Sequence, residues 1–251
     1  MQQSFFQRVR TYSPKAFDIP ALECLSDRAV EPQAETSALR AIPGEIFENV
    51  KIKLHHGDLP DGLDLGPMVA IDTETLGLNP FRDRLCLVQM SAGDDVCHAV
   101  QFTSDVHAPN LMRLLGDPAV LKLFHFARFD VATLKRHVGV TPAPVYCTKI
   151  ASRLARTYTD RHGLKDLVKE LLGVDLSKEQ QSSDWGAPAL SEKQLAYAAN
   201  DVAYLHRLKG ALDAMLIREG RMAHAEACFA FLPARAELDL AGWGDVDIFA
   251  H

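Results

Sequence analysis

The stretch Met68-Val69-Ala70-Ile71-Asp72-Thr73-Glu74 carries the strongest fold signal in this sequence. Its first four residues form a short apolar run, which is typical of a β-strand buried on both faces. Asp72 and Glu74 follow two residues apart, so in an extended chain both carboxylates project to the same face. Acids fixed at the end of a buried strand need a positive neighbour, and such oxygen ligands suit Mg²⁺ or Mn²⁺. The alternative interpretation is that Asp72 caps a turn and Glu74 is a solvated loop residue.

Strand and helix patterns alternate outward from this run, which predicts an α/β fold with a mixed sheet. Strand patterns cover residues 51–56, 68–71, 85–90, 96–102 and 120–126, with a short segment near Val145. Helical patterns cover residues 109–115, 130–137, 148–155, 164–172, 191–218 and 223–231. Residues 1–50 show no clear period. We therefore predict a poorly structured N-terminal extension over residues 1–50 and one domain over residues 51–251.

Composition excludes several classes of protein. No apolar run approaches the roughly 20 residues needed to cross a bilayer, so we expect no membrane span. The net charge of −6 argues against a broad basic surface for long duplexes, and it favours short substrates that need few phosphate contacts. Five widely spaced cysteines include no C-x-x-C pair, which argues against a zinc ribbon. Reduced thiols in a cytoplasmic protein are the simplest interpretation.

Two further acids occupy places where the chain changes structure. Asp130 follows the segment His125-Phe126-Ala127-Arg128-Phe129, where a predicted strand gives way to a helix. An aspartate at such a place is often only an N-cap. Asp201 lies four residues after Tyr197 in a predicted helix, so the two side chains are neighbours. Alone, this pattern is more often a surface pair.

Taken together and in order, the three acidic motifs resemble those of the DEDDy 3′–5′ exonucleases, the ribonuclease D-like branch of the ribonuclease H-like fold. Residues 85–91, the segment Gly163-Leu164-Lys165-Asp166-Leu167 and the segment Ser183-Asp184-Trp185 extend the resemblance. Within that family the chain is most similar to the nano-RNase C group. That likeness rests on residues 72–80, 82–86 and 239–243, whereas residues 1–50 have no recognised counterpart.

The resemblance implies a mixed five-stranded sheet flanked by helices and an enzyme that releases nucleoside 5′-monophosphates from 3′ ends. The implied substrate is very short RNA, above all dinucleotides. A general 3′–5′ exonuclease of longer RNA or DNA and an inactive nucleic-acid-binding module stay open as alternatives. The resemblance also implies two divalent metal ions, Mg²⁺ or Mn²⁺, and a homo-oligomer, with an octamer as one candidate.

The resemblance further implies a role for each site residue. Asp72, Glu74 and Asp201 would hold one metal ion, Asp72 would also touch the second, and Asp130 would act through water. Tyr197 would be catalytic by orienting the attacking water, since a phenol is too weak an acid to serve as the main base near neutral pH.

Six residues are candidates for substrate binding: Thr73, Leu78, His125, Lys165, Gln181 and Trp185. Leu78 would wedge against a terminal base, although an ordinary core leucine is an equal alternative. His125 would lie beside the scissile phosphate, unless it is a satisfied residue at a strand end. The alternative interpretation of Lys165 is a residue on a solvated helix face, and that of Trp185 is a packing residue. A polar loop containing Arg156, Tyr158, Arg161 and His162 is a further candidate for holding a 5′ phosphate.

Overall fold

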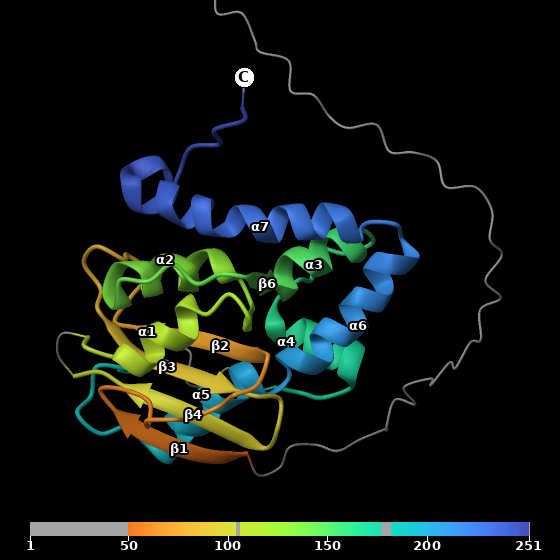
Figure 1. Cartoon of the computed structure of the whole chain (residues 1–251). Coiled ribbons are helices and arrows are strands. Elements are labelled where there is room, and N and C mark those ends of the chain that lie inside the picture. Colours follow the sequence, from red (N-terminus) through yellow and green to blue (C-terminus); the bar gives the residue numbers. More distant parts are fainter. Residues whose placement is uncertain (1–49, 104–105, 177–181, 251) are drawn as a thin grey trace, which may run out of the picture. The chain divides into compact units, whose positions relative to one another are not determined.

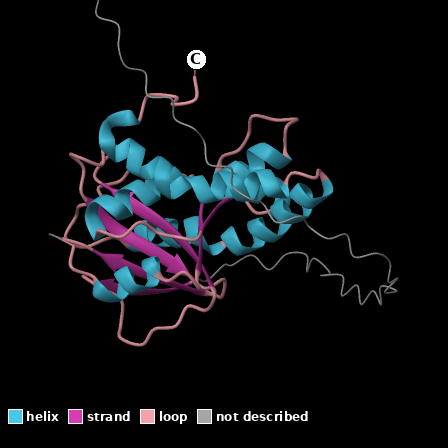
Figure 2. Ribbon diagram, turned by 45° about the horizontal axis from the view of Figure 1, so that its top comes forward, coloured by secondary structure: helices cyan, strands magenta, loops and turns pink. Residues whose placement is uncertain are grey.

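A computed structural model describes residues 50–103, 106–176 and 182–250 of this chain. The extension predicted for residues 1–50 therefore lies outside the described residues, apart from Val50, and so does Gln181. The described chain folds around one mixed β-sheet with helices on both faces (Figures 1 and 2). This arrangement is the α/β class predicted from the sequence.

The sheet contains six strands in the order β1-β4-β3-β2-β5-β6. The strands are β1 (Lys51–His56), β2 (Met68–Thr75), β3 (Leu85–Ser91), β4 (Val96–Gln101), β5 (Leu121–Phe124) and β6 (Val145–Cys147). Strand β3 is antiparallel to both of its neighbours, whereas β1–β4, β2–β5 and β5–β6 are parallel pairs. The implied number of five strands is wrong. Strand β1 pairs along the whole of β4, so backbone groups that would otherwise form an open edge are hydrogen-bonded.

The helices supply two of the four acids, Asp130 and Asp201, beside the pair on β2. They are α1 (Pro109–Gly116), α2 (Ala127–Val138), α3 (Thr148–Ala155), α4 (Leu164–Leu167), α5 (Glu192–Ala203), α6 (Leu205–Arg218) and α7 (Met222–Leu238), with π-helical turns η1 (Val168–Leu172) and η2 (Asp239–Trp243). Helices α2 and α5 both pack against β2 and β3, from opposite faces of the sheet (Figure 1). Helix α7 lies across α2 and β6. No helix in the described ranges is long and apolar enough to cross a membrane.

Several predicted boundaries shift near the acids. Strand β2 continues to Thr75, so Asp72 and Glu74 lie inside the strand instead of following it. Strand β5 ends at Phe124 because Phe126 adopts a left-handed backbone conformation. The helix predicted over residues 191–218 is interrupted at Tyr204. Its first part begins with a capping box: the Ser191 hydroxyl accepts a hydrogen bond from the Gln194 backbone amide, and the Gln194 side chain accepts one from the Ser191 backbone amide.

Candidate active site

The four acids come from one strand and two helices. Asp72 and Glu74 alternate with the buried Thr73 on β2, and Asp201 reaches them from α5. Carboxylate oxygens of Asp72, Glu74 and Asp201 all lie within 4.8 Å of one another. Asp130 projects from the first turn of α2 and is only 3% exposed. The alternative interpretation of Asp130 as an N-cap is wrong, because the helix already begins at Ala127.

Neutral hydrogen-bond donors hold these carboxylates in place. The Gln89 amide donates to Asp72 over 2.7 Å, and the two residues are direct cross-strand partners in the β2–β3 pair. The Thr73 hydroxyl donates to Asp130 over 2.6 Å. The Tyr197 hydroxyl donates to Asp201 from one helical turn away. Each donor fixes a carboxylate without neutralising its charge.

Burial and mutual repulsion make these acids reluctant to ionise. Burial raises the pKa of Glu74 to about 9, with the charges of Asp201 and Asp130 adding to the effect. Burial likewise raises the pKa values of Asp130 and Asp201 to about 7 each. The pKa of Asp72 is raised well above its usual range by burial and by the other three carboxylates. Such shifts are typical of functional sites.

The donor set fits divalent cations. Among the described residues, no lysine or arginine forms an ion pair with any of the four acids. Closely spaced carboxylates without a counter-charge are costly to ionise, and hard oxygen ligands favour Mg²⁺ or Mn²⁺. Asp72, Glu74 and Asp201 can offer one oxygen each to a single ion.

Asp72, Glu74 and Asp201 line a cleft of about 700 Å³ that also gathers most of the predicted substrate-binding residues. Its lining includes Thr73, Leu78, His125, Lys165, Trp185 and Tyr197. Thr73 is almost fully buried, and its hydroxyl is committed to Asp130. In this structure its side chain therefore positions an acid.

Leu78 stands out from the surface with 83% of the residue exposed, so the alternative of a core leucine is wrong. The loop that presents it is tightly built. Asp83 accepts a hydrogen bond from the Asn79 amide and pairs with Arg82. A Cβ atom on Gly77 would lie 2.4 Å from an Asp83 oxygen, so this close approach requires glycine. The loop holds Leu78 at the rim of the cleft, where a wedge residue would stand.

His125 lies at the cleft as a neutral side chain. Burial and the nearby Lys149 lower its pKa to about 3, and its Nδ1 lies 2.9 Å from the Thr148 hydroxyl. His125 can therefore contact a substrate through hydrogen bonding but not through positive charge. Lys149 also lines the cleft, and its ammonium lies 4.1 Å from the centre of the Phe126 ring. Sequence reasoning missed Lys149, since nothing in its local sequence distinguishes it from a solvated helical lysine.

Trp185 is mainly a packing residue. It is 3% exposed and belongs to a small core cluster with Cys86, Leu87 and Ala198, and its ring lies 6.1 Å from that of Tyr197. Trp185 thus packs against Tyr197. Lys165, on α4, is half-buried at the cleft and forms no ion pair within the described residues.

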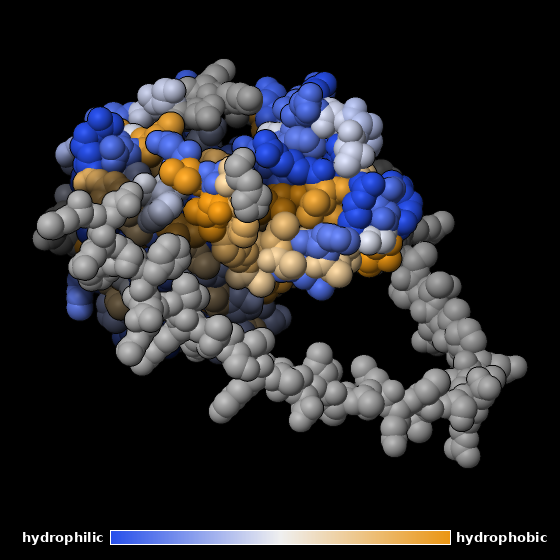
Figure 3. All heavy atoms as spheres, turned by 90° about the horizontal axis from the view of Figure 1, so that it is seen from above, coloured by the Kyte–Doolittle hydropathy of each residue, from blue (hydrophilic) through white to orange (hydrophobic). Residues whose placement is uncertain are grey.

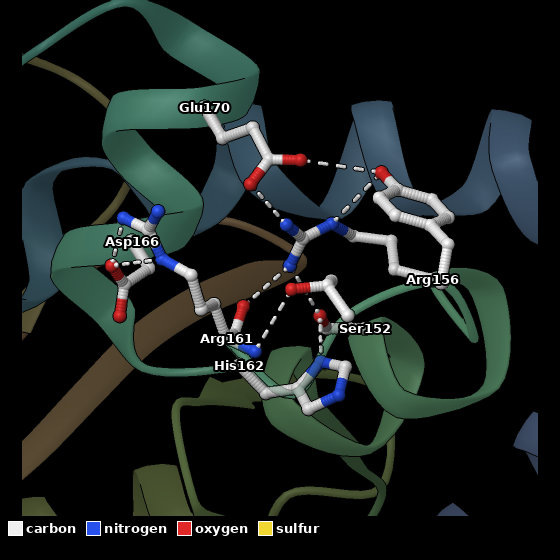
Figure 4. Close-up of polar contacts among 8 residues, drawn as sticks. Ser152, Arg156, Arg161, His162, Asp166 and Glu170 are labelled. Carbon is white, nitrogen blue, oxygen red and sulfur yellow. Dashed lines mark hydrogen bonds and ion pairs between the residues drawn. The ribbon is translucent and has the colours of Figure 1, made fainter.

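The polar loop after α3 proves to be an internal network (Figure 4). Arg156 has no exposed side-chain surface and pairs with Glu170. Its guanidinium also donates to the Ser152 hydroxyl over 3.0 Å and to the Arg161 carbonyl over 2.8 Å. His162 completes the network, with Nδ1 lying 2.8 Å from the Ser152 hydroxyl. The proposed phosphate contact through Arg156 is therefore wrong, because its hydrogen-bonding groups are used inside the fold.

Replacing Glu170 tests this structural role. Glu170→Ala leaves the buried Arg156 guanidinium without its anion, and we expect a loss of about 2 kcal/mol in the free energy of unfolding. In a chain of this size, that loss lowers the Tm by roughly 4–8 °C. Thermal melts would measure it, with the exposed Glu226→Ala as control. An unchanged Tm together with a large loss of hydrolysis would instead place this network in substrate binding.

The fold and the site together define a class of protein. A mixed sheet of this order, with three carboxylates converging from its central strand and a late helix, is the framework of ribonuclease H-like nucleases. Residues 52–217 match the model of the 3′–5′ exonuclease family. The chain belongs to that family, in its DEDDy, ribonuclease D-like branch.

Individual relatives agree with this assignment. The chain is 36% identical over 164 residues to ribonuclease D of Acidiphilium cryptum, an alignment that covers 65% of this chain and 42% of that protein. It thus spans less than half the length of the curated ribonuclease D proteins that it matches. The structure of Brucella melitensis NrnC shares 58% identity and a TM-score of 0.78, covering 80% of this chain and 98% of that one. Escherichia coli RNase D is more distant, with 26% identity, a TM-score of 0.60 and coverage of 68% and 45%.

Proposed function

We propose that the protein is a 3′–5′ exonuclease that hydrolyses very short oligoribonucleotides, above all dinucleotides, to nucleoside 5′-monophosphates. The observation that carries the proposal is the cluster of Asp72, Glu74 and Asp201 oxygens on the lining of a cleft beside Tyr197. Solved structures of Brucella melitensis NrnC, the relative with 58% identity, include one bound to pGG and one with bound Mg²⁺. The proposal extends that substrate class and that metal to this chain.

The charge of the cleft supports a preference for short substrates. Only two cationic side chains, Lys149 and Lys165, line it within the described ranges, and His125 is neutral. A long strand is held mainly through many phosphate contacts, each of which needs a positive partner. Two lysines suit a substrate with one or two phosphates. The exposed Leu78 supplies an apolar contact that a base can meet.

In the mechanism that we propose, Asp72, Glu74, Asp130 and Asp201 hold two divalent ions, Mg²⁺ or Mn²⁺. Such ions lower the pKa of water, neutralise the phosphate and stabilise the departing 3′ oxygen. Gln89 and Thr73 keep Asp72 and Asp130 in fixed orientations. Burial and the neighbouring acids raise the pKa of Tyr197 above its usual value, so its hydroxyl stays protonated. It can therefore orient a water molecule by hydrogen bonding, but it cannot act as the base.

We expect Tyr197→Phe to lower kcat by roughly tenfold to a hundredfold, because only the orienting hydroxyl is lost. KM for a dinucleotide should change little, and the Tm should not fall. Steady-state kinetics would measure the effect, with Tyr158→Phe as control because that tyrosine lies outside the cleft. Full activity in Tyr197→Phe would remove this tyrosine from the mechanism.

Substrate length is tested by a time course with a labelled dinucleotide and a seven-nucleotide RNA, both carrying a 5′ phosphate. We expect the dinucleotide to be hydrolysed far faster than the longer strand in Mg²⁺. Equal or slower dinucleotide hydrolysis would favour the alternative, a general 3′–5′ exonuclease of longer RNA or DNA. A matched DNA dinucleotide measures the preference for ribose.

We also propose a cytoplasmic homo-oligomer, with an octamer as one candidate. The cysteines in the described part of the chain are unpaired, as is usual in a reducing compartment. Large apolar residues of α7 and the following segment are exposed: Phe231, Trp243, Val246, Ile248 and Phe249. Figure 3 shows apolar residues gathered on the face that α7 forms. Light scattering that detects only a monomer would contradict the assembly.

A further inference from the structure

A second pocket of about 660 Å³ adjoins the cleft of the acids. The two share Leu78, Phe126 and Phe129 in their linings, so these residues form a ridge between them. The far side of the second pocket is formed by Phe81, Arg128, Asp239 and Asp245. Its volume lies within the range of roughly 300–1,000 Å³ that is usual for small-ligand sites.

Charge indicates what chemistry this second pocket would accept. Both arginines that line it are already paired, Arg82 with Asp83 and Arg128 with Asp239 over 2.5 Å. Arg128 also donates to the Gly244 carbonyl over 2.6 Å, which fixes the segment after α7 as one wall. Asp245 adds a further negative charge. A phosphate finds no unpaired cation here among the described residues, whereas a planar base finds exposed aromatic side chains.

Phe126 is the side chain best placed to meet such a base. It is 47% exposed at the ridge, directly after the cleft residue His125. Its φ of 69° lies in the left-handed region, which a bulky side chain rarely adopts. Asparagine or glycine would adopt this conformation with less strain. The backbone conformation therefore does not explain a phenylalanine at this position.

Continuity with the cleft supports a role in substrate binding. Lys149 places its ammonium 4.1 Å from the Phe126 ring centre while lining the cleft. Because Leu78 lines both pockets, a dinucleotide with its phosphodiester at the acids and Leu78 wedged between its bases would place one nucleotide in the cleft and the other beyond Leu78. The ridge is therefore within reach of the second base, and aromatic faces bind bases by stacking without regard to sequence.

We propose that Phe126 is a base-stacking residue, and that the pocket between Phe126, Phe81 and Asp245 receives one of the two bases of the dinucleotide substrate. This inference rests on the proposed function and adds a specificity-determining residue to it. The pocket gives a dinucleotide a contact that compensates for the few phosphate contacts. It therefore makes the base, as well as the phosphate, part of substrate recognition.

The test uses the full chain in Mg²⁺ with three substrates: 5′-phosphorylated GG and two versions that lack one base each. Phe126→Asn removes the ring and keeps the left-handed conformation easy to form, so its Tm should not fall. We expect this variant to raise KM for intact GG roughly tenfold or more. It should have no such effect on the substrate that lacks the stacked base. Phe126→Trp should restore a low KM, and Ile217→Asn, at an exposed position of α6, is the control.

The outcomes separate this inference from the proposed function. If the wild type hydrolyses GG and Phe126→Asn has the same KM for it, the stacking role alone is overturned. An equal rise in KM for all three substrates overturns it as well, because the ring would then act without contacting a base. A wild-type protein that hydrolyses no dinucleotide contradicts the proposed function, and the inference fails with it.

Discussion

Asp72→Asn should abolish dinucleotide hydrolysis, lowering kcat by roughly 10³-fold or more. Asp72 belongs to the three-acid cluster, and losing a ligand that holds catalytic cations removes several kcal/mol of transition-state stabilisation. Asparagine matches aspartate in shape, so the contact with Gln89 can persist. Steady-state kinetics in Mg²⁺ would measure the loss. Asp94→Asn, in the turn between β3 and β4, is the matched control.

The same variant should keep its fold and gain stability in the absence of metal. Removing one of several clustered negative charges relieves the repulsion that raises the pKa values of the remaining acids. We therefore expect the Tm of metal-free Asp72→Asn to exceed that of the wild type, and Mg²⁺ to stabilise it less. Retained hydrolysis would refute the site assignment. A wild type that hydrolyses neither RNA nor DNA would instead favour the alternative of an inactive binding module.

The second large effect concerns stability against pH without metal. The pKa of Glu74 is raised to about 9, and those of Asp130 and Asp201 to about 7. Groups whose folded pKa exceeds the unfolded value hold extra protons in the folded state. Their stabilising effect is present below the unfolded pKa, near 4, and is lost as the pH rises through the folded values. The metal-free protein should therefore lose stability between about pH 4 and pH 9.

The expected size of this loss is several kcal/mol, or a fall in Tm on the order of 10 °C. Thermal melts in a chelator across this pH range would measure it. Excess Mg²⁺ at the upper end should restore the Tm, because a bound cation supplies the missing counter-charge. Glu74→Gln removes the group with the highest pKa of these three and should flatten the slope of Tm against pH. A Tm that rises with pH in chelator would contradict this electrostatic account of the site.

Much of the fold could be predicted because its signals are local. The apolar run before Asp72 predicts a central strand, and the helical pattern that begins at Ser191 predicts the start of α5. Boundaries near the site were harder to predict. Phe126 ends β5 early through a conformation that phenylalanine seldom adopts, and tertiary packing has to impose it. The resemblance implied five strands, whereas the sixth strand of the sheet, β1, pairs with β4 through residues 45 positions apart, which no local pattern shows.

The acids of the site were predictable as a set, but their supporting residues were not. Gln89 is a polar residue in an apolar strand, and only the β2–β3 register shows that it faces Asp72. Lys149 and Phe126 reach the cleft from the ends of elements that the sequence leaves far apart. For Arg156 the sequence predicted a binding role that the structure does not support, since this basic loop residue is fully buried and pairs with Glu170. Burial of this kind follows from packing and carries no local sequence signal.

The most direct test is product analysis after dinucleotide hydrolysis in H₂¹⁸O with Mg²⁺. Attack of water on phosphorus, with departure of the 3′ oxygen, predicts nucleoside 5′-monophosphate carrying one ¹⁸O on its phosphate. The upstream product should have a free 3′ hydroxyl, and a chelator should stop the reaction. A 2′,3′-cyclic phosphate, a 3′-phosphate product or full activity in chelator would contradict cation-dependent hydrolysis at the four carboxylates.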